Sequence, residues 1–396
     1  MRCSIHKHLQ GTTVFFVLYA VVQQVLHAVT FQHERRWSDP DDASVMVNAL
    51  LLEDHSTDTV NRTQPARDGM GACLMIKEDV DLLYEWIAYH HTVLPLRYLF
   101  VGSDVGNTQD PQHVLDRWET ITGLDVSVVN VSDLVVAAPQ VLAPATRQEA
   151  HHAFVHRQKA FVQECARRLK QKGARWTTFI DSDEFLVWNR VGTDDETEDI
   201  EDLRERKALP PVDSATTVLD YLDAQRDGNQ STCITLPRLI VGSLETKPCR
   251  NAAVTRRRAT SDFRLHSLST LRFFQHAKKG DFSSSKFGKV VMDLSRIEDE
   301  LLEQKPRNIH RPYKEHCGPS VVYFPSALFY LNHYIGSWER YRSREDQRRN
   351  RGEWEQRAYF DDGVSCDKEV HRWFDRFVDR FGTSRAQYLL GVANEY

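Results

Sequence analysis

The sequence lacks the features that would place it in several common classes. Its seven cysteines include no Cys-x-x-Cys pair, so the sequence gives no support for a zinc ribbon or a thioredoxin-type redox site. The same cysteines are too few for a disulfide scaffold in a chain of 396 residues. The net charge of -5 gives no basis for a nucleic-acid surface, and no internal repeat is present.

The composition that is present is that of an ordinary globular protein. Hydrophobic residues make up 41% of the chain and charged residues 27%, so most of it is expected to fold. Its length allows one large domain or two domains of average size.

The N-terminal segment has the pattern of a targeting signal. Residues 12–22 (TTVFFVLYAVV) form an apolar run after a mildly basic head, and the polar pair Gln23 and Gln24 interrupts it. A cleaved secretory signal explains this pattern. A type II signal anchor is one alternative, because residues 14–29 nearly reach the roughly 20 residues of a membrane span; a buried N-terminal helix is another. Residues 1–29 are therefore predicted to be a signal anchor or a signal peptide.

Two further features agree with an address in the lumen of the secretory pathway. Three Asn-x-Ser/Thr sequons, the acceptors of N-glycosylation, begin at Asn61, Asn130 and Asn229. In an oxidising compartment, disulfides could form among Cys233, Cys249, Cys317 and Cys366. The sequence does not determine how these cysteines pair.

Hydrophobic patterning divides the chain into a polar linker and a folded body. Residues 30–69 are polar, which predicts a stem or linker. The folded body is expected over 70–396, with a first half at about 70–190, an irregular part at about 214–350 and C-terminal helices at 351–396.

Strands and helices alternate at the start of the folded body. Short apolar runs predict strands, and apolar residues at helical spacing predict helices. Their order is strand 72–76, helix 82–90, strand 98–101, helix 114–121 and strand 124–130. This β-α-β-α-β alternation predicts an α/β fold with a mostly parallel, doubly wound sheet and right-handed crossovers.

The later part of the chain is less regular. We expect a surface crossover at 137–148, an acidic insertion at 189–211 and a hairpin at 263–274. The remaining predicted helices are 151–172, one that Ser214 caps and that extends to residue 225, 337–349 and 368–381. The remaining predicted strands are 176–180, 231–236, 289–294 and 320–324.

Three acids follow the predicted strand 176–180 within four residues. Asp181, Asp183 and Glu184 are costly to bury unpaired, so their position at the end of an apolar strand indicates a compensating positive charge. A hard divalent cation with oxygen ligands supplies such a charge. Open α/β sheets also bind ligands beyond the carboxyl ends of their strands. The alternative is a strand that ends in a solvated acidic turn.

A histidine in the apolar aromatic run 328–335 is the second unusual polar group. His333 is a candidate third ligand for a cation held by Asp183, with a diphosphate completing the coordination. The alternative for His333 is a hydrogen-bonded histidine of the core.

The sequence resembles GT-A glycosyltransferases of glycosyltransferase family 92, which have a nucleotide domain like that of family 2. The resemblance spans about 70 to 345 in separated blocks, of which the acidic block is the most specific. The blocks are LMIKEDVDLLYEWIAYHH, YLFVGSDVGNTQDPQHVL, HRQKAFVQECARR, RWTTFIDSDEFLVW and LNHYIGSWERY. It implies a GT-A fold with helices on both faces of the sheet and an irregular acceptor-side subdomain.

The resemblance also assigns roles to individual residues. It implies that Lys77, Glu78 and Asp104 contact the base and ribose, and that Arg157 and Lys159 neutralise phosphate. Asp181 and Asp183 would hold metal and diphosphate, with His333 as the third protein ligand. Lys286, Lys289 and His310 fall in the block that closes the acceptor side. The chain departs from the family pattern at Asp79 and at Ser103-Asp104-Val105.

The activity that the resemblance implies is metal-dependent glycosyl transfer with inversion. The donor would be a nucleoside-diphosphate sugar, and the resemblance to family 92 suggests UDP-galactose. The acceptor would be a glycan on a glycoprotein or polysaccharide. Mn²⁺ or Mg²⁺ would assist the leaving group, and Glu245 is the candidate catalytic base. The alternatives are a catalytically inactive, lectin-like carbohydrate-binding relative and a metal-dependent phosphohydrolase.

The N-terminal segment and the activity together predict a location. We expect a single-pass type II protein of the Golgi or ER membrane with its catalytic domain in the lumen. Secretion after signal cleavage is the alternative.

Overall fold

The computed structural model describes most of the chain from residue 69 onward. The described ranges are 69–135, 146–189, 209–210, 216–226, 232–243, 263, 267–276, 288–317, 327–343, 351–358, 365–366 and 370–393. They belong to one compact unit. The predicted signal at 1–29 and the predicted linker at 30–69, apart from its last residue, lie outside these ranges.

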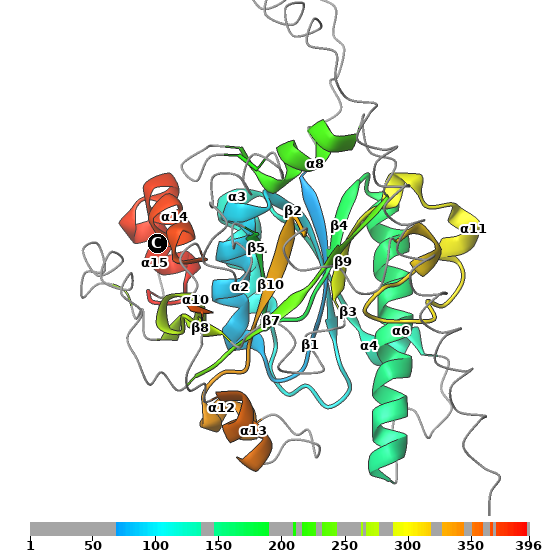
Figure 1. Ribbon diagram of the computed structural model, residues 1–396, viewed down its shortest axis with the longest axis horizontal. Helices are drawn as coiled ribbons and strands as arrows, with labels where there is room; N and C mark the ends of the chain where they lie inside the picture. Colours follow the sequence, from blue (N-terminus) through cyan, green and yellow to red (C-terminus); the bar gives the residue numbers. More distant parts are fainter. Residues whose placement is uncertain are drawn as a thin grey trace, which may run out of the picture. The chain divides into compact units, whose positions relative to one another are not determined.

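A six-stranded sheet forms the centre of this unit (Figure 1). Its strand order is β3-β2-β1-β4-β9-β6. The strands are β1 (Met70–Ile76), β2 (Leu96–Ser103), β3 (Asp125–Asn130), β4 (Trp176–Phe179), β6 (Cys233–Leu236) and β9 (Lys289–Asp293). Strands β3, β2, β1 and β4 are parallel, whereas β9 is antiparallel to both β4 and β6. The predicted α/β fold with a mostly parallel sheet is therefore confirmed.

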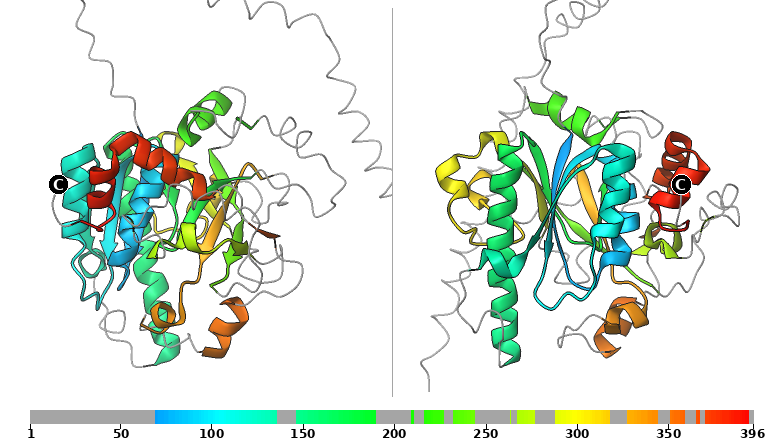
Figure 2. Two further views of the ribbon diagram at one scale, coloured as in Figure 1. Left: turned by 90° about the vertical axis from the view of Figure 1, so that its left-hand side faces the viewer. Right: turned by 180° about the vertical axis from the view of Figure 1, so that it is seen from behind.

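Helices cover both faces of this sheet (Figures 1 and 2). On one face lie α2 (Val80–Val93) and α3 (Gln112–Thr122), and on the other lies α6 (Arg147–Gln171). Successive residues of β1 point to opposite faces, so Leu74 packs in the core beneath α2 while Cys73 packs beneath α6. Burial on both faces explains why β1 reads as a continuous apolar run.

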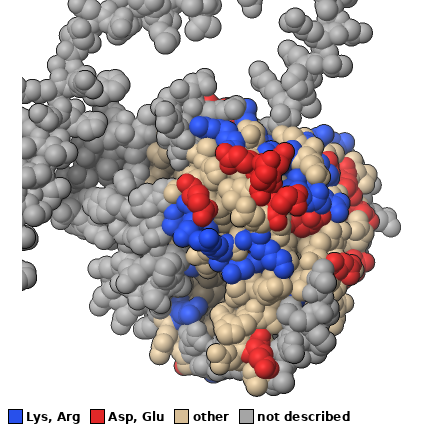
Figure 3. Space-filling view, turned by 90° about the vertical axis from the view of Figure 1, so that its right-hand side faces the viewer, with Lys and Arg blue, Asp and Glu red and all other residues tan. Residues whose placement is uncertain are grey.

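The long helix α6 begins at a capping box. The Thr146 hydroxyl accepts a hydrogen bond from the Glu149 backbone N–H at 3.2 Å, and the Glu149 carboxylate accepts one from the Thr146 N–H at 2.9 Å. The short helix α11 (Asp299–Leu302) packs against α6, and Lys170 forms an ion pair with Asp299 at 2.6 Å. Basic and acidic side chains are mixed on the face that these two helices form (Figure 3).

The C-terminal helices add a layer outside α2 and α3. These are α14 (Trp373–Phe381) and α15 (Thr383–Leu389). Phe377 packs on Trp118 with ring centroids 6.1 Å apart, and Arg117 donates a hydrogen bond to the Tyr388 carbonyl at 2.8 Å. The predicted helix at 368–381 is confirmed over residues 373–381.

A second, five-stranded sheet has the order β11-β8-β7-β10-β5. Its strands are β5 (Glu184–Trp188), β7 (Arg238–Val241), β8 (Gln275–His276), β10 (Phe329–Tyr334) and β11 (Ser365–Cys366). Strand β10 is antiparallel to β5 and parallel to β7. Because β5 follows β4 almost directly, the chain passes from the first sheet to the second through residues 181–184, which we call the acidic turn.

The remaining elements are short. They are α4 (Val131–Leu134), α8 (Val218–Arg226), α10 (Ser269–Arg272), α12 (Trp338–Ser343), α13 (Arg351–Ala358) and the 3₁₀ helices at Leu294–Arg296, Lys314–His316 and Val370–Arg372. The helix predicted from Ser214 begins later, because Thr217 and Asp220 form its capping box. Ser214, most of 137–148 and 189–211, and the strand predicted at 320–324 lie outside the described residues.

The hairpin predicted at 263–274 is wrong. Residues 269–272 form α10 instead, because the Glu85 carboxylate accepts hydrogen bonds from the backbone N–H groups of Ser269 and Thr270, both at 2.7 Å. These are the donors that a helix N-terminus leaves unsatisfied. The Thr270 hydroxyl in turn accepts a hydrogen bond from the indole of Trp373 at 2.8 Å.

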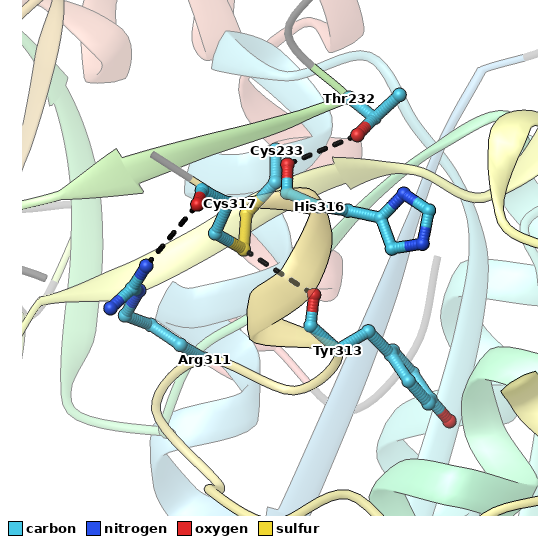
Figure 4. Close-up of a disulfide and its surroundings, with 6 residues drawn as sticks. All are labelled: Thr232, Cys233, Arg311, Tyr313, His316 and Cys317. Carbon is cyan, nitrogen blue, oxygen red and sulfur yellow. Dashed lines mark hydrogen bonds between the residues drawn. A yellow bond between two sulfur atoms is a disulfide. The ribbon is translucent and has the colours of Figure 1, made fainter. Parts of the chain in front are cut away.

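Two disulfides connect distant parts of the described chain. Cys73 of β1 bonds to Cys165 of α6, and Cys233 of β6 bonds to Cys317 (Figure 4). The second bond joins two of the four cysteines proposed from the sequence. The first was not anticipated, because both of its members read as ordinary core residues.

Candidate active site

The acidic turn lies where the order of the parallel strands reverses. The chain continues from β1 to β2 on one side, while β4 pairs with β1 on the other. Ligands of open α/β sheets bind in the crevice outside the carboxyl ends of the strands at such a point. A hydrogen bond crosses it, since the Ser182 hydroxyl donates to the carboxylate of Asp79 at 2.8 Å.

The turn itself is tightly hydrogen-bonded. The Glu184 carboxylate accepts from the Asp181 N–H at 3.0 Å, and the Glu184 N–H donates to the Asp181 carbonyl at 3.1 Å. The indole of Trp86 on α2 donates to the same carbonyl at 3.1 Å. The alternative of a solvated turn is therefore not supported, because the N–H and carbonyl of Asp181 and the N–H of Glu184 have protein partners.

The second sheet brings His333 to the turn. Strand β10 pairs with β5 in a register that places His333 opposite Glu184, and the Tyr334 N–H donates to the Asp183 carbonyl at 2.9 Å. The Nε2 atom of His333 lies 3.6 Å from Oδ1 of Asp183. Nδ1 of His333 is buried and has no hydrogen-bond partner among the described residues. The predicted association of Asp183 with His333 thus has a geometric basis.

Asp181 has a different neighbour. Its Oδ1 atom lies 2.8 Å from Nζ of Lys289, the first residue of β9. Partial desolvation acts to raise the pKa of the Asp181 carboxyl, but with the ammonium of Lys289 beside it that pKa lies below its usual value. The carboxylate of Asp181 is therefore ionised and paired at neutral pH.

Glu184 is fully buried beneath the turn. Arg238 of β7 forms an ion pair with it at 3.0 Å, and Nζ of Lys289 lies 3.8 Å away. Buried carboxylates require such partners, because an isolated charge in the protein interior is strongly unfavourable. Glu184 therefore links the two cations that lie behind the acidic turn.

His310 lies close enough to Lys289, Arg238 and Asp181 to feel their charges. Burial lowers the pKa of His310 to about 3, with further contributions from the charges of Lys289 and Arg238. Its imidazole is consequently neutral at physiological pH. The sequence placed Lys289 and His310 in a block on the acceptor side, whereas the structure places Lys289 in direct contact with Asp181.

The residues predicted to contact the nucleotide follow β1 and β2. Glu78 adopts a positive φ of 56°, and its carboxylate accepts hydrogen bonds from the N–H and hydroxyl of Thr108 at 2.5 and 3.0 Å. Glu78 thus orders the loop after β2. Lys77 lies over this loop, next to Gly106, and has no hydrogen bond or ion pair within the described part of the chain.

Asp104 and Arg157 satisfy one another. The guanidinium of Arg157 on α6 donates two hydrogen bonds to the Asp104 carboxylate, at 2.6 and 2.9 Å, and both side chains are buried. This fork-to-fork pair fixes α6 to the end of β2. Lys159, two residues further along α6, is half-buried and has no ion pair among the described residues. Of the predicted phosphate ligands, Lys159 is thus the one whose charge is not already paired.

The fit of a divalent cation can be judged from Asp183 and His333. Two donors that each lie about 2.1 Å from one ion are at most about 4.2 Å apart. The separation of 3.6 Å between Nε2 and Oδ1 satisfies this limit. No group of three or more His, Cys, Asp and Glu side chains with a metal-binding arrangement occurs among the described residues. Among the described residues, Asp183 and His333 are therefore spaced so that they could hold one cation, whereas the carboxylate of Asp181 contacts Lys289.

Two further predictions concern the surroundings of the site. The candidate base Glu245 lies outside the described residues. Within the described part of the chain, no helix is both long and apolar enough to span a membrane.

Arg238 and Lys289 are the charged residues whose contacts the sequence did not reveal. Both are isolated cations in apolar strands, at Arg238-Leu-Ile-Val and Lys289-Val-Val-Met. A cation at the start of a buried strand needs a carboxylate partner. The presence of such isolated cations was therefore the sequence signal that could have indicated buried ion pairs. The sequence does not identify that partner, because the acids belong to a distant segment.

Comparison with known proteins identifies the first part of the folded body. The family model of glycosyltransferase family 92 matches residues 73–227, a range that contains the acidic turn but not Lys289, His310 or His333. No curated protein and no solved structure matches the chain. The predicted resemblance is thereby confirmed, and the chain carries a glycosyltransferase family 92 region at residues 73–227.

Proposed function

We propose that this protein is a metal-dependent glycosyltransferase with a GT-A fold. It transfers a sugar from a nucleoside-diphosphate sugar to a hydroxyl group of a glycan. The observation that carries the proposal is the acidic turn at the strand-order reversal of the parallel sheet, inside the matched family region, with His333 facing Asp183. The family resemblance favours UDP-galactose as the first donor to test.

The proposed reaction is a single displacement with inversion. The acceptor oxygen forms a bond to the anomeric carbon while the bond from that carbon to the diphosphate oxygen breaks. The electron pair leaves with the diphosphate, and the acceptor proton passes to a carboxylate base, for which Glu245 stays our candidate. Such a base contributes about 10²- to 10⁴-fold to the rate.

The described residues have separate roles in this proposal. Asp183 and His333 would hold a divalent ion, Mn²⁺ or Mg²⁺, which when bound neutralises charge on the departing diphosphate. Lys77 and Lys159, neither of which has an ion pair among the described residues, would bind the nucleotide. The Asp104–Arg157 pair and Glu78, which follow the carboxyl ends of β2 and β1, would hold the loop after β2 in place.

A donor screen tests the proposal directly. The full chain would be incubated with UDP-, GDP- and CDP-sugars and a mixed glycan acceptor, with Mn²⁺ or with EDTA, and release of nucleoside diphosphate measured. We expect turnover of one donor class that requires the metal. Donor binding without turnover would favour a carbohydrate-binding relative, and no metal-dependent turnover of any donor would refute the proposal.

Asp183→Ala is the matching variant. It should abolish transfer while leaving the melting temperature nearly unchanged. Asp125→Ala is the control, because Asp125 forms an exposed ion pair with Lys172 away from the turn. Retained activity in Asp183→Ala, together with a large loss of stability, would contradict the metal role.

We further propose that the protein acts in the lumen of the secretory pathway, as a type II membrane protein or after signal cleavage. The two disulfides support this, because such bonds persist in oxidising compartments. Asn130 offers a test, since it is exposed at the start of α4 and makes no side-chain capping bond there. A glycan on Asn130, detected by mass spectrometry and removed by peptide N-glycosidase, would agree with the lumen; an unmodified Asn130 in secretory-pathway material would count against it.

A further inference from the structure

One cation of the site is built into the fold. Strand β9 runs antiparallel to β4, and their register pairs Phe179 with Val290. The first residue of β9, Lys289, therefore lies beside the carboxyl end of β4, where the parallel strands deliver their ligand-binding residues. Gly288 permits this approach, because a Cβ atom at that position would lie 2.4 Å from the Leu236 carbonyl oxygen.

Lys289 is held as a charged group. Its side chain is only 4% exposed. Burial would lower the pKa of Lys289, but the carboxylates of Asp181 and Glu184 outweigh burial and raise it. An ammonium group is therefore fixed where the order of the parallel strands reverses, before any ligand binds.

The two carboxylates beside Lys289 differ in what else they do. Glu184 is fully buried and already paired with Arg238 at 3.0 Å. The side chain of Asp181 is 45% exposed, so it covers Lys289 on the side that faces solvent. An incoming anion can replace Asp181 at Nζ without uncovering Glu184.

We propose that Lys289 binds the diphosphate of the donor, and that Asp181 is the group it exchanges for this ligand. The inference rests on the proposed function and gives the two aspartates of the Asp-x-Asp pair different roles. Asp183, with His333, would bind the cation, whereas Asp181 keeps Lys289 charged and in place until the diphosphate displaces it. The leaving group is then neutralised from two sides.

The first test measures binding of UDP by calorimetry in EDTA and again with Mn²⁺, using the full chain. Lys289→Met should weaken UDP binding in EDTA by about tenfold or more, because a charge-assisted hydrogen bond is lost. Lys289→Arg should bind within a few-fold of the wild type. Lys172→Met is the matched control, because it removes another lysine–aspartate pair, at the exposed Asp125, and should change nothing.

The second test separates a ligand-binding lysine from a purely structural one. In Asp181→Asn, the competitor for Nζ is weakened, so metal-free UDP binding should tighten. The same substitution in a Lys289→Met background should give a much smaller gain. Equal gains in the two backgrounds would show that Asp181 only repels the anion and would overturn the proposal.

The possible failures are distinguishable. If the wild type binds neither UDP, GDP nor CDP, the proposed function and the role of Lys289 are both refuted. If the wild type binds UDP and a folded Lys289→Met binds it equally well in EDTA, the role of Lys289 is refuted while the proposed function stands. If Lys289→Met does not fold, Lys289→Gln replaces it in both tests, because its amide can still donate a hydrogen bond to Asp181 but carries no charge.

Discussion

The two halves of the site differ in how they are held together. The first half, from β1 to the acidic turn, is built from neighbouring strands and helices of a parallel sheet and lies within the matched family region. The second half supplies single residues from β7, β9 and β10, namely Arg238, Lys289 and His333. Local sequence patterns therefore determine the backbone framework of the site, whereas distant strands supply the basic side chains that contact its acids.

The largest expected effect comes from removing the metal-facing pair from either half. His333→Ala should abolish metal-dependent transfer as completely as Asp183→Ala, because each removes one of the two protein ligands that we propose for the cation. Mn²⁺ titration of activity and of UDP binding would measure this. Full activity in His333→Ala would show that the second half only supports the first and does not contribute a ligand.

Arg238→Met should cause the largest loss of stability. It leaves the fully buried Glu184 with Lys289 at 3.8 Å as its nearest remaining ion-pair partner. Breaking a buried ion pair costs about 3–5 kcal/mol of the free energy of unfolding. Denaturant unfolding would measure it, with Arg168→Met as control. Arg168 is 49% exposed in its pair with Glu164, and such surface pairs contribute at most about 1 kcal/mol.

The two disulfides allow the halves to be compared directly. They close loops of similar length, with sequence separations of 92 and 84 residues, so removal of either should cost about 2–5 kcal/mol of stability. Replacing Cys73 and Cys165 by alanine should leave the donor KM unchanged. Replacing Cys233 and Cys317 should lower stability and, in addition, raise the donor KM. The reason is that this disulfide attaches the segment that contains His310 and Cys317 to β6. Equal effects on the donor KM would contradict this difference.

Acid sensitivity should come from buried histidines of both halves, including His90 in the first and His310 in the second. Burial lowers the pKa of His90 to about 3, while the unfolded chain has a histidine pKa near 6.5. Between these values the unfolded state binds a proton that the folded state cannot, so stability falls as the pH is lowered. His90→Gln should reduce the slope by up to about 1.4 kcal/mol per pH unit. Denaturant melts at pH 7, 6 and 5 would measure it, and an unchanged slope would assign the sensitivity to other groups.

The first half was predictable because its signals are local. The apolar runs of β1, β2 and β3 and the spacing in α2 and α3 determine the parallel alternation without reference to distant residues. The acidic turn could also be placed at the end of β4, since three carboxylates after a buried strand require an explanation.

The second half was less predictable because its contacts are long-range. Nothing near Lys289 in the sequence indicates that its partner is Asp181, or that β9 is antiparallel. The helix α10 replaces the predicted hairpin because Glu85, far away in the sequence, caps it. In each case a tertiary partner overrides or completes what local patterning indicates.

The position of β10 has a consequence for the thermodynamics of ligand binding. His333 sits on a strand that is hydrogen-bonded on both sides, to β5 and to β7, so its backbone cannot shift without breaking two ladders. The Asp183 carbonyl is held by the Tyr334 N–H of β10, so adjustment of its carboxylate is confined to the side-chain torsions. The entropic cost of orienting the imidazole is therefore met when the protein folds, and only the carboxylate side remains to be ordered when a ligand arrives.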